Sequence, residues 1–188
     1  LFTGGQVVDA IVSHIDIFPT VCDLLGIQPP ERLQGKSMLP LVRGEADTIR
    51  DEVFAEVNYH AAYEPKRAIR TSRYKYIRRY DDRQSPVLPN VDDSLSKDVL
   101  LANGYRDHAP EKEKLFDLIF DPNEANNLIA HPDYAEILTD MQSRLDRWME
   151  ETSDPLSDGD IVAPSKAVAN HPDDLSPTSP PLPLFRQG

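Results

Sequence analysis

The clearest hydrophobic pattern in the chain is a single apolar stripe between residues 132 and 151. Its members recur every three or four positions and the intervening positions are mostly charged or polar, which predicts one amphipathic helix. Asp133 and Glu136 fall in the first turn, where acidic side chains stabilise the positive end of the helix dipole. The stripe consists of Tyr134, Ile137, Leu138, Met141, Leu145, Trp148 and Met149.

Four short segments before this helix predict β-strands, at 53–57, 67–71, 74–79 and 115–118. A tight turn at Ser72 joins the second and third. Side chains alternate along the third, so Tyr74, Tyr76, Arg78 and Tyr80 share one face, whereas Lys75, Ile77 and Arg79 share the other. An amphipathic helix must bury its stripe, and the sheet is the available partner. We therefore expect an α+β fold, a small antiparallel sheet of about four strands packed by one long C-terminal helix.

Toward the N-terminus the pattern predicts an extended strand that enters a helix. Residues 6–12 are largely apolar and β-branched, which favours a strand. Asp16 is expected to cap a helix that Gly26 ends. Residues 28–44 are rich in Pro and Gly and predict a loop with one short turn near Leu39, and 95–103 predicts one further short helix.

Composition and charge narrow the class of protein. The 188 residues carry a formal net charge of −12, which argues against a general role in binding nucleic acid or a membrane surface. No apolar run is long enough to cross a membrane. The single cysteine, Cys22, excludes an internal disulfide framework. The sequence begins at Leu1 rather than Met and shows no signal-peptide pattern, so we expect a preceding segment and leave the compartment open.

Several local motifs, taken in order, resemble the sulfatase family. The similarity extends over roughly residues 5–156 and is strongest to the heparan N-sulfatase (N-sulfoglucosamine sulfohydrolase) branch. The motifs are VSHIDIFPT at 12–20, LQGKSMLP at 33–40, RAIRT at 67–71, YKYI at 74–77, LFDL at 115–118, DPNE at 121–124, NNL at 126–128 and WMEETSDPL at 148–156.

The resemblance implies an alkaline-phosphatase-like parent enzyme. Residues 1–45 would then end its large α/β domain, 46–156 would form its C-terminal subdomain, and 157–188 would be a Pro- and Ser-rich tail, extended or disordered. The parent would hydrolyse sulfate esters or N-sulfates of a sulfated saccharide in a periplasmic, secreted or lysosomal setting. Association with further copies of the chain is left open.

The resemblance also implies where the chemistry lies. In the family the nucleophile is a formylglycine made from the Cys of a Cys-x-Pro-Ser-Arg motif, and calcium is held by Asp and Asn residues upstream of the matched region. This sequence contains no such motif, and Cys22 lies in VCDLL. We therefore assign no catalytic residue and no metal ligand, and expect the chain alone to be inactive.

The candidate substrate-binding residues are Asn58, Tyr59, His60 and Arg67. The first three directly follow a predicted strand, where a rigid element can aim a short loop, and the resemblance places this loop near the substrate pocket. His60 can donate or accept a hydrogen bond, and the Arg67 guanidinium suits a sulfate group. The alternative is that His60 is an ordinary histidine of a surface loop, with no role in binding.

Eight basic residues gather between positions 66 and 83 of an otherwise acidic chain. They could bind an anionic glycan, which would make the chain a non-catalytic binding module, or they could form ion pairs on a solvated sheet surface. A further alternative is part of a related phosphodiesterase or phosphatase of the same superfamily. The basic residues are Lys66, Arg67, Arg70, Arg73, Lys75, Arg78, Arg79 and Arg83.

The remaining candidates are better explained by structural roles. Cys22 lacks an activating setting and suits a buried position in a helix. His14 and Asp16 are too few to form a metal site. The acidic residues between 117 and 133 lack the spacing and the glycine of a calcium-binding loop, and residues 121–124 are expected to form a turn.

Overall fold

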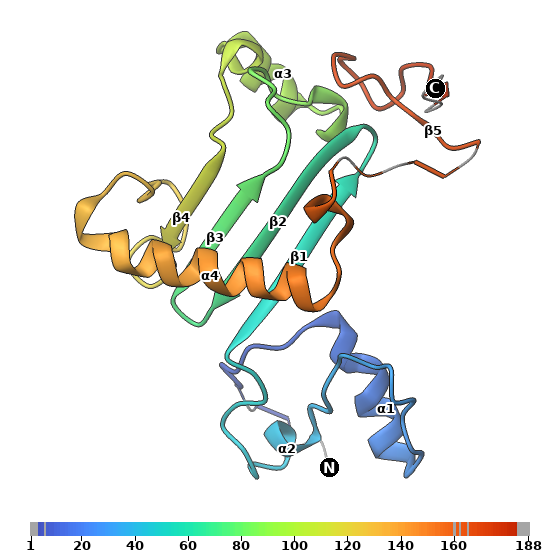
Figure 1. The fold of residues 1–188 in the computed structure, drawn as a ribbon, viewed down its shortest axis with the longest axis vertical. Coiled ribbons are helices and arrows are strands. Elements are labelled where there is room, and N and C mark those ends of the chain that lie inside the picture. The colour runs from blue at the N-terminus through green and yellow to red at the C-terminus, as the bar shows by residue number, and fades with distance from the viewer. Residues whose placement is uncertain (1–3, 6, 160, 162, 165, 184–188) are drawn as a thin grey trace.

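The structure, a computed structural model, describes residues 4–5, 7–159, 161, 163–164 and 166–183. It has two parts, which the first strand connects (Figure 1). The smaller part holds helices α1 (Ile17–Leu25) and α2 (Leu39–Val42), and the larger part is a sheet crossed on one face by helix α4 (Ala135–Glu151). None of the described helices is both long and apolar enough to cross a membrane.

The four strands of the main sheet form a simple antiparallel meander. They are β1 (Glu52–Tyr59), β2 (Tyr63–Thr71), β3 (Tyr74–Arg79) and β4 (Glu113–Asp117), and they neighbour one another in chain order. All four were predicted, although β1 and β2 extend beyond the predicted bounds and β4 begins two residues earlier and ends one residue earlier than predicted. β2 passes through Pro65, which lies beside the only register shift of the β1–β2 pair, where a residue without an N–H is tolerated.

The hydrophobic core lies between this sheet and α4. Phe54, Ile69, Tyr76 and Leu115 pair in register and form one row across the four strands. The α4 side chains Met141, Leu145 and Met149 pack on this row, and all three are buried. At the end of the row the Phe54 and Trp148 rings stack with centroids 4.8 Å apart. The predicted fold class and the predicted stripe are confirmed.

The N-terminal part corrects one prediction and qualifies another. The strand predicted over 6–12 is wrong where the structure describes it, because residues 7–12 form no strand. β-Branched residues favour extended backbone, but a strand also needs a neighbour for its N–H and C=O groups, and no described segment pairs with this one. The helix is present, and Gly26 ends it with a left-handed φ of 65°, as predicted.

Asp16 stands at the N-cap position immediately before α1, as expected, but its side chain makes no capping bond to that helix. A short turn, η1 (His14–Asp16), precedes α1. The fully buried Asp16 carboxylate accepts the backbone N–H groups of Ser13 (2.7 Å) and Lys36 (2.8 Å) and forms an ion pair with Arg50. This carboxylate therefore connects α1 to the loop after it and to the segment that leads into β1.

Two segments lie at the end of the sheet far from α1. The connection from β3 to β4 contains η2 (Leu88–Asn90), α3 (Leu95–Ala102) and η3 (Tyr105–Asp107). After η4 (Pro132–Tyr134), α4 and η5 (Pro155–Ser157), the C-terminal segment returns to this end (Figure 1). There Val168–Ala169 (β5) pairs with Leu182–Pro183 (β6). The helix predicted over 95–103 is confirmed to within one residue.

Gly35 tests the close packing of the N-terminal part. A Cβ atom at this position would lie 1.9 Å from the carbonyl oxygen of Ile15. Because this neighbour is backbone, Gly35→Ala is expected to lower the free energy of unfolding by about 2 kcal/mol, measured by urea denaturation of the chain. Gly4→Ala is the control, since no atom of the residues that the structure describes lies within 4 Å of its added Cβ. Equal unfolding midpoints for the two variants would contradict this packing.

Candidate functional site

The β1–β2 hairpin ends in a tip, residues 58–62, which carries three of the four candidate residues. The pairing register shifts between Val57 and Tyr59, and such an irregularity re-aims side chains. Asn58 at the shift is partly buried, whereas His60 is exposed. The Tyr59 ring lies against the Tyr63 ring, with centroids 4.8 Å apart. The structure thus brings Asn58, Tyr59 and His60 together on one short loop.

The fourth candidate, Arg67, is fully buried behind this tip. Its Nε and Nη2 donate to the two carboxylate oxygens of Asp154, at 2.5 and 2.9 Å. Its Nη1 donates to Asn58 Oδ1 at 2.8 Å and to the carbonyls of Lys66 (2.9 Å) and Val57 (3.3 Å). Every guanidinium nitrogen therefore has an acceptor within the chain. The substrate contact of Arg67 stays a prediction, and the geometry gives the side chain a second task, holding Asn58.

Asp154 is a residue that reasoning from the sequence missed. It lies 87 positions after Arg67, just beyond the end of α4, and is 4% exposed. Its carboxylate also accepts the N–H of Leu156 at 3.0 Å, and its own N–H donates to the Met149 carbonyl at 2.8 Å. Burial alone would raise the pKa of Asp154, but the hydrogen bonds from Arg67 and Leu156 outweigh it and lower the pKa.

A row of charged residues lies next to the hydrophobic row, on the same face of the sheet. Glu56, Arg67, Arg78 and Glu113 pair in register across the four strands. Arg78 donates to Glu113 at 3.2 Å and to Asp146 of α4 at 2.6 Å. Two adjacent arginines repel each other unless carboxylates neutralise them. Asp146 on α4 and Asp154 beyond its end supply this charge from the helix side.

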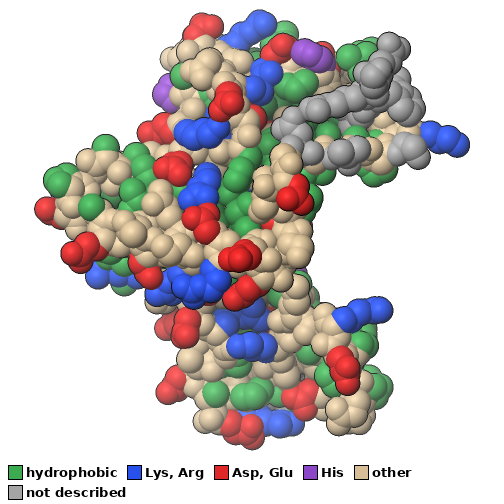
Figure 2. All heavy atoms as spheres, viewed as in Figure 1, with side chains coloured by type: hydrophobic (Ala, Val, Ile, Leu, Met, Phe, Trp, Pro, Cys, Tyr) green, Lys and Arg blue, Asp and Glu red, His purple; other side chains and the backbone are tan. Residues whose placement is uncertain are grey.

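Most of the basic cluster is neutralised in the same way. Acidic and basic side chains lie next to one another over this face of the molecule (Figure 2). Seven of the eight basic residues form ion pairs, and the exposed Arg70 has no carboxylate partner among the described residues. The pairs are Lys66–Glu64, Arg67–Asp154, Arg73–Asp117, Lys75–Glu124, Arg78–Glu113, Arg79–Asp81 and Arg83–Asp173. The geometry therefore favours paired charges over an open surface for anionic glycans.

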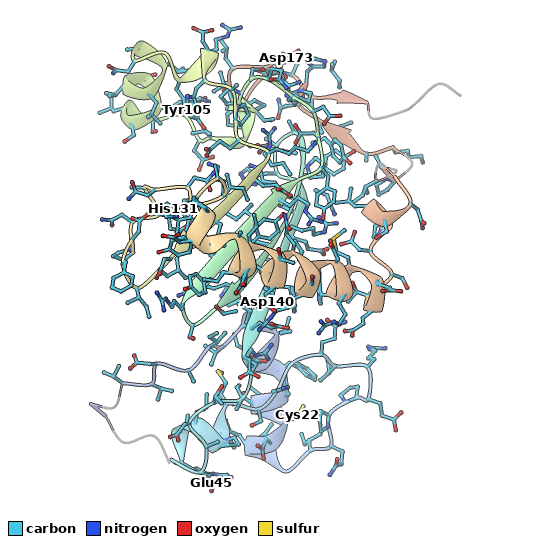
Figure 3. The ribbon with its side chains drawn as sticks, turned by 60° about the vertical axis from the view of Figure 1, so that its left-hand side comes forward. Cys22, Glu45, Tyr105, His131, Asp140 and Asp173 are labelled. Carbon is cyan, nitrogen blue, oxygen red and sulfur yellow. The ribbon has the colours of Figure 1, made fainter. Side chains whose placement is uncertain are left out.

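The other candidates take structural positions. Cys22 is buried in α1, in the part of the molecule opposite Asp173 and Tyr105 (Figure 3). Asp121 accepts the backbone N–H groups of Ala125 and Asn126, which lower its pKa and close a turn. Across the residues that the structure describes, no group of three or more His, Cys, Asp or Glu side chains could hold a metal ion.

Comparison with known proteins identifies the family. Residues 2–98, just over half of the chain, match the model of the family described as N-sulphoglucosamine sulphohydrolase, C-terminal. The chain belongs to this family. The resemblance seen in the motifs is thereby confirmed, and it now rests on the arrangement of sheet and helix as well.

Relatives of the sulphohydrolase C-terminal family extend over most of this chain. An ulvan-active sulfatase of Formosa agariphila is 30% identical over 165 residues, which cover 85% of this chain and 33% of that protein. Human N-sulphoglucosamine sulphohydrolase is 27% identical over 203 residues, covering 95% of this chain and 38% of that protein. A solved 2-O GAG sulfatase has a TM-score of 0.55 at 27% identity and covers 76% of this chain and 26% of that one. The chain thus spans about a third of the length of the curated relatives it matches.

The Arg67–Asp154 pair makes the stability of this C-terminal domain depend on pH. The pKa of Asp154 is lower in the folded chain, so its contribution is complete above the unfolded pKa of about 3.9 and declines as the pH falls through the folded value. Asp154→Asn leaves the buried Arg67 with only the exposed Glu56 carboxylate, 3.7 Å away, as a counter-charge. The variant is therefore expected to lower the free energy of unfolding by about 3 kcal/mol at pH 7.

The difference between wild type and Asp154→Asn is expected to shrink as the pH falls below about 4, because wild type then loses the same charge. Urea denaturation at a series of pH values measures it. Asp158→Asn, an exposed aspartate nearby, serves as the control and should match wild type throughout. A difference that stays constant with pH would contradict the assignment of the charge to this pair.

Proposed function

We propose that this chain is the C-terminal part of a sulfatase that hydrolyses sulfate ester or N-sulfate groups of a sulfated saccharide. The family match carries the proposal, and the named relatives, an ulvan-active sulfatase and N-sulphoglucosamine sulphohydrolase, support this substrate class. Within that enzyme the chain supplies structural closure and one wall of the substrate pocket. The exposed His60, at the tip of the hairpin, is the group that we assign to the saccharide.

The chemistry of this enzyme is proposed to lie in a preceding segment. No Cys-x-Pro-Ser-Arg motif occurs in the 188 residues, so a formylglycine nucleophile would come from that segment. The described residues do not fit a metal site either. We therefore assign the ligands of the enzyme's divalent cation, which we propose to be calcium, to the same segment.

The surface of the N-terminal part supports such a partner segment. Helix α1 and the residues before it expose apolar side chains that a stable monomer would cover, and isolated patches of this kind promote association. The family relatives are about three times as long as the chain, which leaves ample length for a covering domain. The exposed side chains include Val8, Val12, Ile15, Ile17, Phe18, Val21 and Leu25.

Sulfate release tests the proposal. The chain by itself is expected to release no sulfate from a chromogenic aryl sulfate or from a panel of N- and O-sulfated saccharides. The same chain preceded by the segment that its relatives carry is expected to release sulfate from a member of that panel, measured by ion chromatography. Turnover by the short chain above blank, or no turnover of any panel member by the long one, would overturn the proposal.

In the long protein, His60→Ala is expected to raise the KM for the saccharide roughly tenfold, since it removes one hydrogen-bonding group from the pocket wall. Its kcat should change less, because His60 is assigned to binding rather than to the reacting atoms. His108→Ala is the matched control: His108 is also exposed but follows η3, in a segment separate from the hairpin tip. Equal KM values for the two variants would remove His60 from the site.

A further inference from the structure

The hairpin tip is held from one side by a single side chain, that of Asn90 at the end of η2. Asn90 Oδ1 accepts the backbone N–H groups of Ala61 and Ala62, at 2.9 and 2.8 Å. Asn90 Nδ2 donates to the Ala62 carbonyl at 3.2 Å and to the Glu64 carboxylate at 3.0 Å. An amide side chain has two acceptor sites and two donors, so Asn90 uses all of them on the tip and the strand after it.

The same tip is held from the other side by the C-terminal segment. The backbone N–H of Asn170 donates to the Ala61 carbonyl at 2.8 Å, and Asn170 is 7% exposed. Asn170 Nδ2 donates to the Ser179 carbonyl at 2.8 Å, which closes the segment on itself. An ion pair between Arg83 and Asp173 fastens the segment to the chain after β3. Figure 3 shows Asp173 at this end of the sheet.

A third set of bonds fixes the start of the tip. Arg67, anchored by Asp154, donates to Asn58 Oδ1, so residues before and after His60 are both held. The His60 backbone N–H donates to the Ala62 carbonyl at 3.3 Å, but its side chain stays exposed. Three segments distant in sequence, at Asn90, Asp154 and Asn170, thus immobilise this loop, two of them directly and Asp154 through Arg67. The one exposed ring of the loop is that of His60. Ordering a binding group before the ligand arrives lowers the entropy lost on binding.

We propose that Asn90 and the C-terminal segment at Asn170 are positioning elements that hold His60 for the saccharide, so that the end of the chain takes part in substrate selection. This inference rests on the proposed saccharide contact of His60. Asn90 bonds to the backbone of Ala61 and Ala62, the two residues after His60. The backbone N–H of Asn170 bonds to the Ala61 carbonyl. Neither needs to touch the substrate.

A double-mutant cycle in the long, active protein tests the inference. Asn90→Ala is expected to raise the KM for the saccharide several-fold with kcat nearly unchanged, because it frees the tip without removing a reacting group. In the presence of His60→Ala, the same change is expected to add little, since the group it positions is gone. Asn103→Ala, an exposed asparagine that bonds only to its own helix, is the control and should leave the KM at the wild-type value.

Hydrogen exchange provides a direct structural readout. The Ala61 and Ala62 amides are expected to exchange faster in Asn90→Ala than in Asn103→Ala, because their acceptor is removed. If Asn90→Ala does not fold, a protein that ends at Gly159 provides the test instead. It lacks the bond from Asn170 to the Ala61 carbonyl but keeps the hydrophobic core between the sheet and α4. It is expected to raise the saccharide KM and, again, to add little to His60→Ala.

The outcomes separate the two claims. If His60→Ala leaves the saccharide KM unchanged, the proposed site is wrong and the inference with it. If His60→Ala raises the KM but Asn90→Ala or the shortened chain does not, or if their effects add fully to that of His60→Ala, the site stands and the inference is overturned.

Discussion

The structure depends on the burial of one helical stripe against one row of strand residues. Helix α4 is mostly charged or polar, and an isolated helix of this length is only marginally stable in water unless Met141, Leu145 and Met149 are covered. The sheet has the complementary need, because the row from Phe54 to Leu115 would otherwise face solvent. The helix and the sheet bury each other's apolar side chains, and this contact determines the position of α4.

The position of α4 in turn determines the charged residues beside it. Its end places Asp154 on Arg67, and Arg67 then holds Asn58 at the hairpin tip. A buried ion pair contributes less net stability than apolar residues of the same shape, but its directional bonds permit only one arrangement. The hydrophobic row thus provides stability, and the charged row next to it determines where the hairpin tip lies. That division explains how a helix distant from the tip affects a candidate binding loop.

The sequence predicted the parts of this arrangement that are local or periodic. The helical spacing of the α4 stripe and the alternation of side chains around Tyr76 each recur over several positions. Such periodic patterns can be recognised from the sequence without any tertiary information. The strand over 6–12 failed because residue preference describes backbone conformation and not the presence of a partner strand. The partners of Asp16 and Arg67 lie 34 and 87 positions away, a separation that no local pattern reports. Asn90 and Asn170 were missed because both bond to backbone atoms of the tip, and every residue has such atoms. Asn170 also bonds to the tip through its own backbone N–H, so its side-chain type gives no signal for this bond.

The most direct test of the account is whether sheet and helix unfold as one unit. Native-state hydrogen exchange of the chain measures the opening free energy of individual amides. Leu145→Ala removes a fully buried side chain from the middle of the stripe, and Ser143→Ala on the exposed face is its control. The account predicts that Leu145→Ala lowers the opening free energies in α4 and at Ile69 and Tyr76 by the same amount, about 3 kcal/mol. Sheet amides that keep their wild-type protection while only α4 opens would contradict it.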